Sequence, residues 1–115
     1  MDVGKFIIVN KIQPNQKIGH YLLIIQGDDI VELFDSLGAK PSDINKIEKF
    51  GPTVQFNSKP VQGTDSTFCG QFCLFVAFNR LLDFDLTLSE VLSDLFSANL
   101  QDNDMLVQNF YEKYA

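Results

Sequence analysis

The 115-residue sequence lacks the features that mark a membrane or secreted protein. It contains no apolar run of about 18 residues, since the longest candidate, residues 68–82, is interrupted by Gln71, Asn79 and Arg80. The N-terminus carries mixed charges followed by only a short apolar stretch, which does not fit a secretory signal. We therefore expect neither a transmembrane helix nor a secreted protein.

Cysteine and histidine are also scarce. The two cysteines, Cys69 and Cys73, lie four residues apart in a predicted helix, where the geometry for a disulfide is poor. Together with the single histidine, His20, they lack the paired spacing that zinc ligands use. We expect no structural disulfide, no metal and no cofactor.

Positive charge is sparse and is nowhere clustered. Residues 1–82 are balanced, so the net charge of −6 lies in residues 83–115, which contain one base, Lys113, and seven acids: Asp83, Asp85, Glu90, Asp94, Asp102, Asp104 and Glu112. Without a basic patch, direct nucleic-acid binding by this chain is not expected. The acidic segment is interpreted first as a solvated helical surface and second as a partner site.

The length and the 45% hydrophobic content fit one domain spanning residues 1–115. β-branched and apolar runs predict strands at residues 6–10, 21–25, 30–34 and 53–57. Helices are predicted from Pro41 to before Gly51 and over residues 68–82. Because the strands precede most of the helices, we expect an α+β fold with a small mixed or antiparallel sheet packed on a central helix.

Two further helices are predicted near the C-terminus. Thr87 and Glu90 form a capping box before an apolar, helix-periodic segment. Asp102 or Asn103 is expected to cap the last helix, which runs through Tyr111.

A predicted hairpin should bring His20 and Asp35 together. The strands at residues 21–25 and 30–34 flank residues 26–29, which have good turn chemistry. In an antiparallel pair, the start of the first strand lies beside the end of the second. We therefore expect His20 and Asp35 to be adjacent, while the acids of the turn lie at the opposite end.

Cys69 opens the predicted central helix. The unpaired N–H groups and the dipole at a helix start favour a thiolate. A cysteine in this position, one histidine and a later acid supply a nucleophile, its base and a residue to orient the base. The alternatives are buried packing for Cys69, a strand-edge position for His20 and a turn cap for Asp35. Cys73 is expected to be buried packing.

Four motifs resemble those of adenain-type cysteine proteases. In chain order they are Gly19-His20-Tyr21, Phe34-Asp35-Ser36-Leu37-Gly38, Val61-Gln62 and Ser66-Thr67-Phe68-Cys69-Gly70-Gln71-Phe72-Cys73. The strand-like residues 5–10 are similar to the segment that precedes the histidine in this family, and the resemblance runs to about residue 82. The family comprises maturation proteases of adenovirus-like viruses, virophages and Polinton-type elements, and is related to the SUMO-specific proteases.

The resemblance implies a papain-like core in the permuted order His, Asp, Cys. It implies Cys69 as nucleophile, His20 as general base and Asp35 as the carboxylate that orients His20. Gln62 would donate a side-chain N–H to the developing oxyanion. These roles meet the requirements of acyl transfer. The alternative for Gln62 is a loop amide bonded to its own backbone.

The resemblance further implies an endopeptidase that cleaves viral capsid precursors at small or glycine-containing sites, in the virion or the infected host cell. The implied partners are a protein or peptide substrate and a peptide or protein activator. Two other functions stay open. One is a deconjugating protease acting on the diglycine tail of a ubiquitin-like modifier. The other is an inactive binding or assembly module, because the family has helices before the first matching strand that help to form the substrate cleft.

Overall fold

The computed structural model describes residues 5–11, 20–27, 29–51, 53–63, 68–82 and 85–114. The strands are β1 (Lys5–Lys11), β2 (His20–Gln26), β3 (Ile30–Phe34) and β4 (Thr53–Phe56). The helices are α1 (Pro41–Ile47), the 3₁₀ turn η1 (Glu48–Phe50), α2 (Cys69–Leu82), α3 (Leu88–Leu95) and α4 (Leu100–Tyr114). Each strand and helix predicted from the sequence is therefore present.

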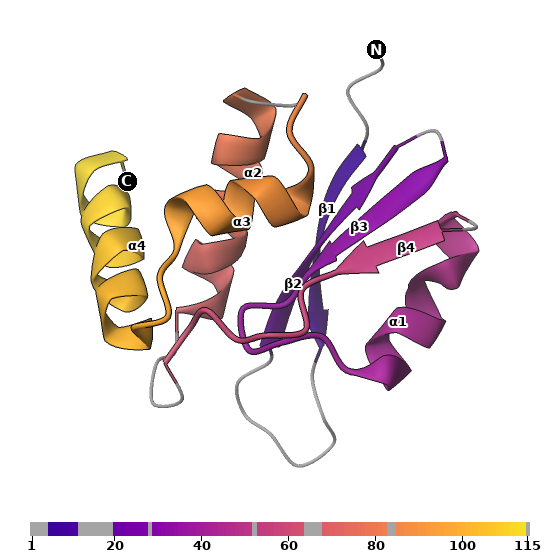
Figure 1. Ribbon diagram of the computed structural model, residues 1–115, viewed down its shortest axis with the longest axis horizontal. Helices are drawn as coiled ribbons and strands as arrows, with labels where there is room; N and C mark the ends of the chain where they lie inside the picture. Colours follow the sequence, from indigo (N-terminus) through magenta and orange to yellow (C-terminus); the bar gives the residue numbers. More distant parts are fainter. Residues whose placement is uncertain are drawn as a thin grey trace.

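The strands form one sheet in the order β1-β2-β3-β4 (Figure 1). β2 pairs antiparallel with β1 and with β3, whereas β3 and β4 are parallel. A parallel pair requires a crossover connection, and the segment containing α1 and η1 supplies it. The predicted α+β class and the hairpin of β2 and β3 are confirmed. In the connecting turn, Gly27 N donates to Ile30 O at 2.9 Å, while Asp28 lies outside the described residues.

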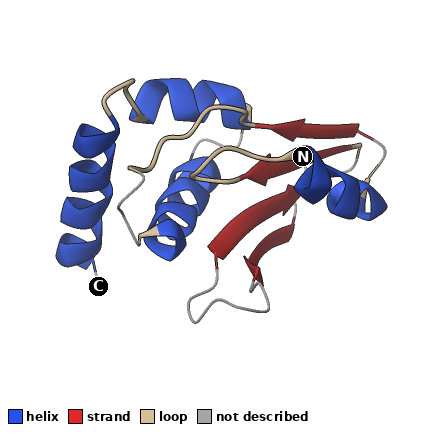
Figure 2. Ribbon diagram, turned by 90° about the horizontal axis from the view of Figure 1, so that it is seen from below, coloured by secondary structure: helices blue, strands red, loops and turns tan. Residues whose placement is uncertain are grey.

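Helices cover the two faces of the sheet unequally. Figure 1 and the view from below in Figure 2 place α1 on one side and α2, α3 and α4 together on the other. Successive side chains of a strand point to opposite faces, so Leu23 and Ile25 join the core under α2, whereas Leu22 and Ile24 join a smaller core with Ile47. Because β2 is buried on both faces, its sequence is an uninterrupted apolar run from Leu22 to Ile25.

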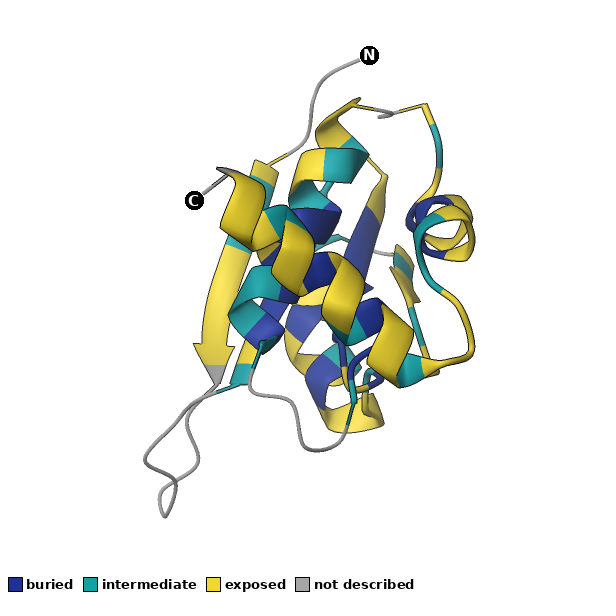
Figure 3. Ribbon diagram, turned by 90° about the vertical axis from the view of Figure 1, so that its left-hand side faces the viewer, coloured by how far each residue is buried: buried dark blue, intermediate teal, exposed yellow. Residues whose placement is uncertain are grey.

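α2 is the central helix of the larger layer. It packs against β2, α3 and α4, and its buried side chains are Cys69, Phe72, Cys73, Phe75 and Val76. Figure 3 shows buried positions gathered between the helices and the sheet, with the outward helix faces exposed. Leu74, Phe78 and Leu81 lie on an exposed stripe of α2. Among the described residues, no helix combines the length and apolar character needed to cross a bilayer.

The predicted N-terminal cap is present in α3 but not in α4. Thr87 Oγ1 accepts from Glu90 N at 3.2 Å and Glu90 Oε1 accepts from Thr87 N at 3.1 Å, which confirms the capping box. The predicted cap of α4 at Asp102 or Asn103 is wrong. The helix begins at Leu100, and Asn99 Oδ1 accepts from Asp102 N at 3.1 Å. Asn103 is buried and bonds to neighbouring loops instead.

Candidate active site

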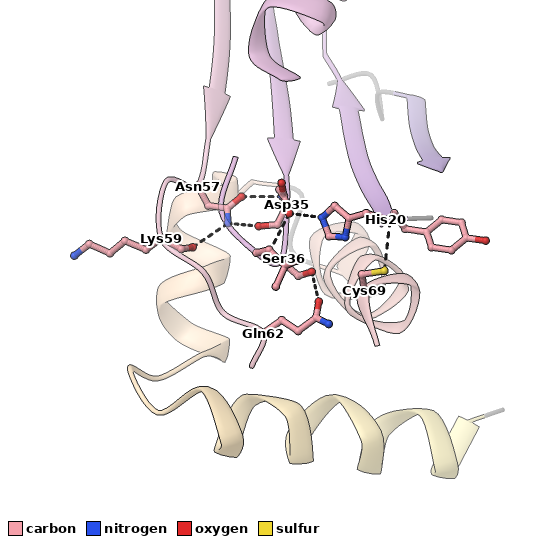
Figure 4. Close-up of polar contacts among 9 residues, drawn as sticks. His20, Asp35, Ser36, Asn57, Lys59, Gln62 and Cys69 are labelled. Atoms are coloured by element: carbon pink, nitrogen blue, oxygen red, sulfur yellow. Dashed lines mark hydrogen bonds and ion pairs between the residues drawn. The ribbon is translucent and has the colours of Figure 1, made fainter. Parts of the chain in front are cut away.

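The four residues singled out in the sequence gather at one end of the sheet (Figure 4). His20 is the first residue of β2, Asp35 directly follows β3, and Cys69 is the first residue of α2. Gln62 lies in the connection between β4 and α2, bonded to the residue after Asp35. The hairpin therefore supplies two of the candidates, and the start of a helix and a loop supply the others.

His20 and Asp35 are in direct contact, as the hairpin prediction required. His20 Nε2 lies 2.6 Å from Asp35 Oδ1, with the histidine side chain 24% exposed and the aspartate side chain 4% exposed. An ionised carboxylate only accepts hydrogen bonds, so the Nε2 of this pair carries a proton. The other ring nitrogen, Nδ1, is then the basic one, and in Figure 4 it lies on the side of the ring that faces Cys69.

Asp35 is held in place by its own backbone and by Asn57. Asp35 N donates to Asn57 Oδ1 at 3.0 Å, and Asn57 Nδ2 donates to the carbonyls of Asp35 and Lys59 at 2.6 and 3.1 Å. Asp35 Oδ1 also accepts from Leu37 N at 2.9 Å. Gly38 closes the turn with a φ of +93°, which an L side chain rarely adopts. These contacts fix the carboxylate that faces His20.

The role of Asn57 was missed in the sequence. It directly follows β4, just as Asp35 directly follows β3. The carboxyl ends of two parallel strands lie at the same edge of a sheet, so this pairing brings the two residues together. The available signal was a polar residue at the end of each of two predicted strands, but the parallel pairing of those strands had not been predicted.

Cys69 lies at the N-terminus of α2 with 8% of its surface exposed. Its Sγ accepts a hydrogen bond from Tyr21 N at 3.4 Å. Within the described part of the chain, no hydrogen bond joins this sulfur to His20. The Tyr21 ring packs over the first turn of α2, since a Cβ added at Gly70 would lie 3.4 Å from Tyr21 Cδ2. The Tyr21 N–H and the unpaired N–H groups of the helix start place partial positive charge near this sulfur.

Cys73 lies one turn further along α2 and has a different environment. It is completely buried, and burial raises the pKa of its thiol far above the ordinary value. Both cysteines are free thiols. The prediction that Cys73 serves as buried packing is confirmed, and a thiol held neutral in this way is not a nucleophile.

Gln62 is 1% exposed, and its side chain is fixed by Ser36. Its Oε1 accepts a hydrogen bond from the Ser36 hydroxyl, and its backbone N–H donates to Ser36 O at 3.0 Å. Ser36 is fully buried beside Asp35. In this orientation Oε1 is the acceptor toward Ser36, and Nε2 is the donor end of the amide. Ser36 belongs to the Asp35 motif, but its link to Gln62 was not predicted.

The described residues contain no group of three or more His, Cys, Asp or Glu side chains suited to holding a metal ion. A comparison with models of protein families finds no match, and neither does a comparison with curated proteins. Evidence on the function therefore comes from the geometry of the site.

Proposed function

We propose that this protein is a cysteine endopeptidase in which Cys69 is the nucleophile, His20 the general base and Asp35 the residue that orients His20. The observation that carries the proposal is the 2.6 Å contact between His20 Nε2 and Asp35 Oδ1, formed beside the helix start that presents Cys69. A partly exposed imidazole paired with a buried carboxylate next to a thiol is the arrangement that activates a thiol nucleophile.

The proposed reaction is acyl transfer through a thioester. His20 Nδ1 accepts the proton of Cys69, and the thiolate attacks the scissile carbonyl carbon. The resulting oxyanion accepts hydrogen bonds from Gln62 Nε2–H and from the backbone N–H of Cys69. The His20 imidazolium, stabilised by Asp35, protonates the leaving amine. Water, deprotonated by His20, then hydrolyses the thioester and restores the free thiol.

In the free protein the sulfur has a different partner from the one this reaction requires. It accepts from the Tyr21 N–H, and the proton transfer needs it to turn toward His20. Catalytic hydrogen bonds commonly tighten only when substrate is bound. The same observation favours the second candidate, a binding or assembly module without catalytic activity.

The fold and biology follow from the motif resemblance and form part of the proposal. The core is papain-like in the permuted order His, Asp, Cys, with the sheet packed on the helix that begins at the nucleophile. The substrates are viral capsid precursors cleaved at small or glycine-containing sites during maturation, in the virion or infected cell. A peptide or protein activator supplements the substrate cleft.

Thiol labelling and peptide cleavage test the proposal together. Wild-type protein is compared with Cys69→Ala and with the matched control Cys73→Ala, using iodoacetamide at pH 6.5 and a fluorogenic peptide amide ending in Gly-Gly. We expect wild-type and Cys73→Ala proteins to be labelled at Cys69 faster than the urea-unfolded chain and to cleave the peptide. Cys69→Ala should lose cleavage by a factor of about 10⁴ or more.

Two outcomes would overturn parts of the proposal. Labelling no faster than in the unfolded chain, together with no cleavage, would favour the binding module. Rapid reaction with a ubiquitin-like modifier bearing a C-terminal electrophile, without cleavage of capsid precursors, would favour a deconjugating protease.

A further inference from the structure

The loop that carries Gln62 is held from two opposite sides. On one side, Ser36 O accepts from the backbone N–H groups of Val61 and Gln62 at 2.8 and 3.0 Å. On the other side, α4 contributes Asn103 and Asp104. α4 lies beyond residue 82, where the motif resemblance ends, so the resemblance assigns it no role.

Asn103 joins the loop to the core of α4. It is 2% exposed, and its Nδ2 donates to Val61 O at 3.0 Å and to Ser97 O at 2.9 Å. Its Oδ1 accepts from Ser97 N at 2.9 Å. All three bonds go to backbone groups, so this one side chain fixes the path of two loops relative to the helix.

Asp104 bonds to the residue that follows Gln62 in the loop. Gly63 N donates to Asp104 Oδ1 at 3.1 Å. A Cβ built on Gly63 would lie only 2.5 Å from Asp104 Oδ2, so a side chain at this position would displace the Asp104 carboxylate. The residues on either side of Gln62 thus bond to two consecutive residues of α4, Val61 to Asn103 and Gly63 to Asp104. The Gln62 side chain bonds to Ser36.

We propose that Asp104 and Asn103 are positioning residues that keep the Gln62 amide in place as an oxyanion donor. This inference rests on the proposed function, because it gives α4 a part in the same reaction. Displacement of a catalytic group by about 1 Å is enough to lower a rate by about 10²-fold. Releasing either end of the Val61–Gly63 loop would permit such a displacement of Gln62.

Asp104 variants test this proposal without emptying the core. Asp104→Ala removes the acceptor for Gly63 N, whereas Asp104→Asn keeps an oxygen at that position, and Asp102→Ala removes an exposed acid from the same turn as a matched control. We expect Asp104→Ala to lower kcat for the Gly-Gly peptide amide about tenfold, the effect of one hydrogen bond. KM should change little, and Asp104→Asn and Asp102→Ala should stay near the wild-type rate.

Two controls separate positioning from a general loss of structure. Iodoacetamide labelling of Cys69 forms no oxyanion, so its rate should be unchanged in Asp104→Ala. In the Gln62→Ala background, Asp104→Ala should cause no further loss, because residues that act through one group are not additive. An equal tenfold loss in both backgrounds, or a matching loss of labelling, would contradict the positioning role.

A readout without catalysis keeps the inference distinct from the proposed function. Amide hydrogen exchange measured by NMR should become about tenfold faster at both Gly63 N–H and Gln62 N–H in Asp104→Ala. Faster exchange at Gly63 alone, with the Gln62 side-chain resonances unmoved, would overturn the inference. A response at Gln62 in Asp104→Ala, combined with a wild-type protein that cleaves no peptide, would count against the peptidase and leave the positioning contact established.

Asn103→Ala is the more severe variant and serves as a second measurement. It leaves the carbonyls of Val61 and Ser97 without their donor and is expected to lower the unfolding midpoint in urea. Provided that the variant remains folded at the assay temperature, its kcat should fall at least as far as that of Asp104→Ala. A folded Asn103→Ala protein with the wild-type kcat would contradict its positioning role.

Discussion

The two halves of the candidate site are fixed to different degrees. The strand-end half consists of His20, Asp35 and Asn57, and bonds of 2.6 to 3.0 Å join these residues. The helix-end half consists of Cys69 and the Tyr21 N–H, joined by one contact of 3.4 Å to sulfur. In the proposed reaction the carboxylate keeps His20 and the Leu37 N–H as partners throughout. The sulfur instead leaves the Tyr21 N–H for His20 and then bonds to the substrate carbon. An aspartate with several short bonds beside a sulfur with a single contact suits that sequence of partners.

Removing the charge of the strand-end half should have the largest effect. Asp35→Asn should lower kcat/KM for the Gly-Gly peptide amide about 10³- to 10⁴-fold, because the imidazolium loses its counter-charge and the ring its fixed tautomer. The matched control is Asp29→Asn, at the exposed hairpin turn at the other end of the two strands. A rate within tenfold of wild type for Asp35→Asn would show that this half is only structural.

The next effect concerns Gln62, the proposed oxyanion donor, which belongs to neither half. Gln62→Ala should lower kcat about 10²- to 10³-fold while iodoacetamide labelling of Cys69 is retained. It should also lower the free energy of unfolding by about 1–3 kcal/mol, because the buried Ser36 hydroxyl loses its acceptor. Gln55→Ala, at an exposed position on β4, is the control in both the kinetic assay and the urea titration. Equal losses of labelling and cleavage would assign Gln62 to folding alone.

Asn57→Ala tests whether the rigidity of the strand-end half matters. Loss of its bonds to Asp35 should lower the free energy of unfolding by about 1–3 kcal/mol. It should also lower kcat/KM about tenfold, because the Asp35 backbone that positions the carboxylate beside His20 is no longer fixed by Asn57. Urea unfolding and peptide cleavage measure the two effects, with the exposed Asn45→Ala on α1 as control. A destabilised variant with full activity would mean that the bonds to His20 and to Leu37 N are sufficient to place the Asp35 carboxylate.

The smallest effect is a change of stability with pH at Cys73, the buried neighbour of the helix-end half. Burial raises the pKa of the Cys73 thiol in the folded state, whereas in the unfolded chain it ionises above about pH 8.5. Above that pH the folded state therefore binds more protons than the unfolded chain. The free energy of unfolding consequently falls as the pH rises. We expect urea titrations of wild type to show this loss between about pH 8.5 and 10.5, and Cys73→Ala to show less of it. An identical pH slope in the two proteins would contradict the assignment to Cys73.

Local patterns in the sequence were sufficient to predict much of this architecture. The capping box at Thr87, the run of β2 and the turn between β2 and β3 each depend on residues close together in the chain, and the structure has all three. That hairpin also placed His20 beside Asp35. The roles of these residues in catalysis stay predictions.

The features that could not be predicted depend on pairing between distant segments. Asn57 meets Asp35 only because β4 is parallel to β3, and Asn103 meets Val61 across 42 residues of sequence. The cap of α4 was misplaced for a related reason. Asn99 and Asn103 both have cap chemistry, and tertiary contacts assign the first to the helix start and the second to the loop.

The parallel pairing of β3 and β4 also has a consequence for the order of folding. The β2–β3 hairpin closes over a few residues, so it can form early and bring His20 to Asp35. The β4 strand joins only after a crossover, and contacts of higher sequence separation form more slowly because more chain entropy is lost first. Asn57 and the Gln62 loop should therefore reach their places late. In the proposed reaction, a nascent chain would carry the base and the carboxylate before the proposed oxyanion donor is in position, so cleavage would begin only once the Gln62 loop has folded.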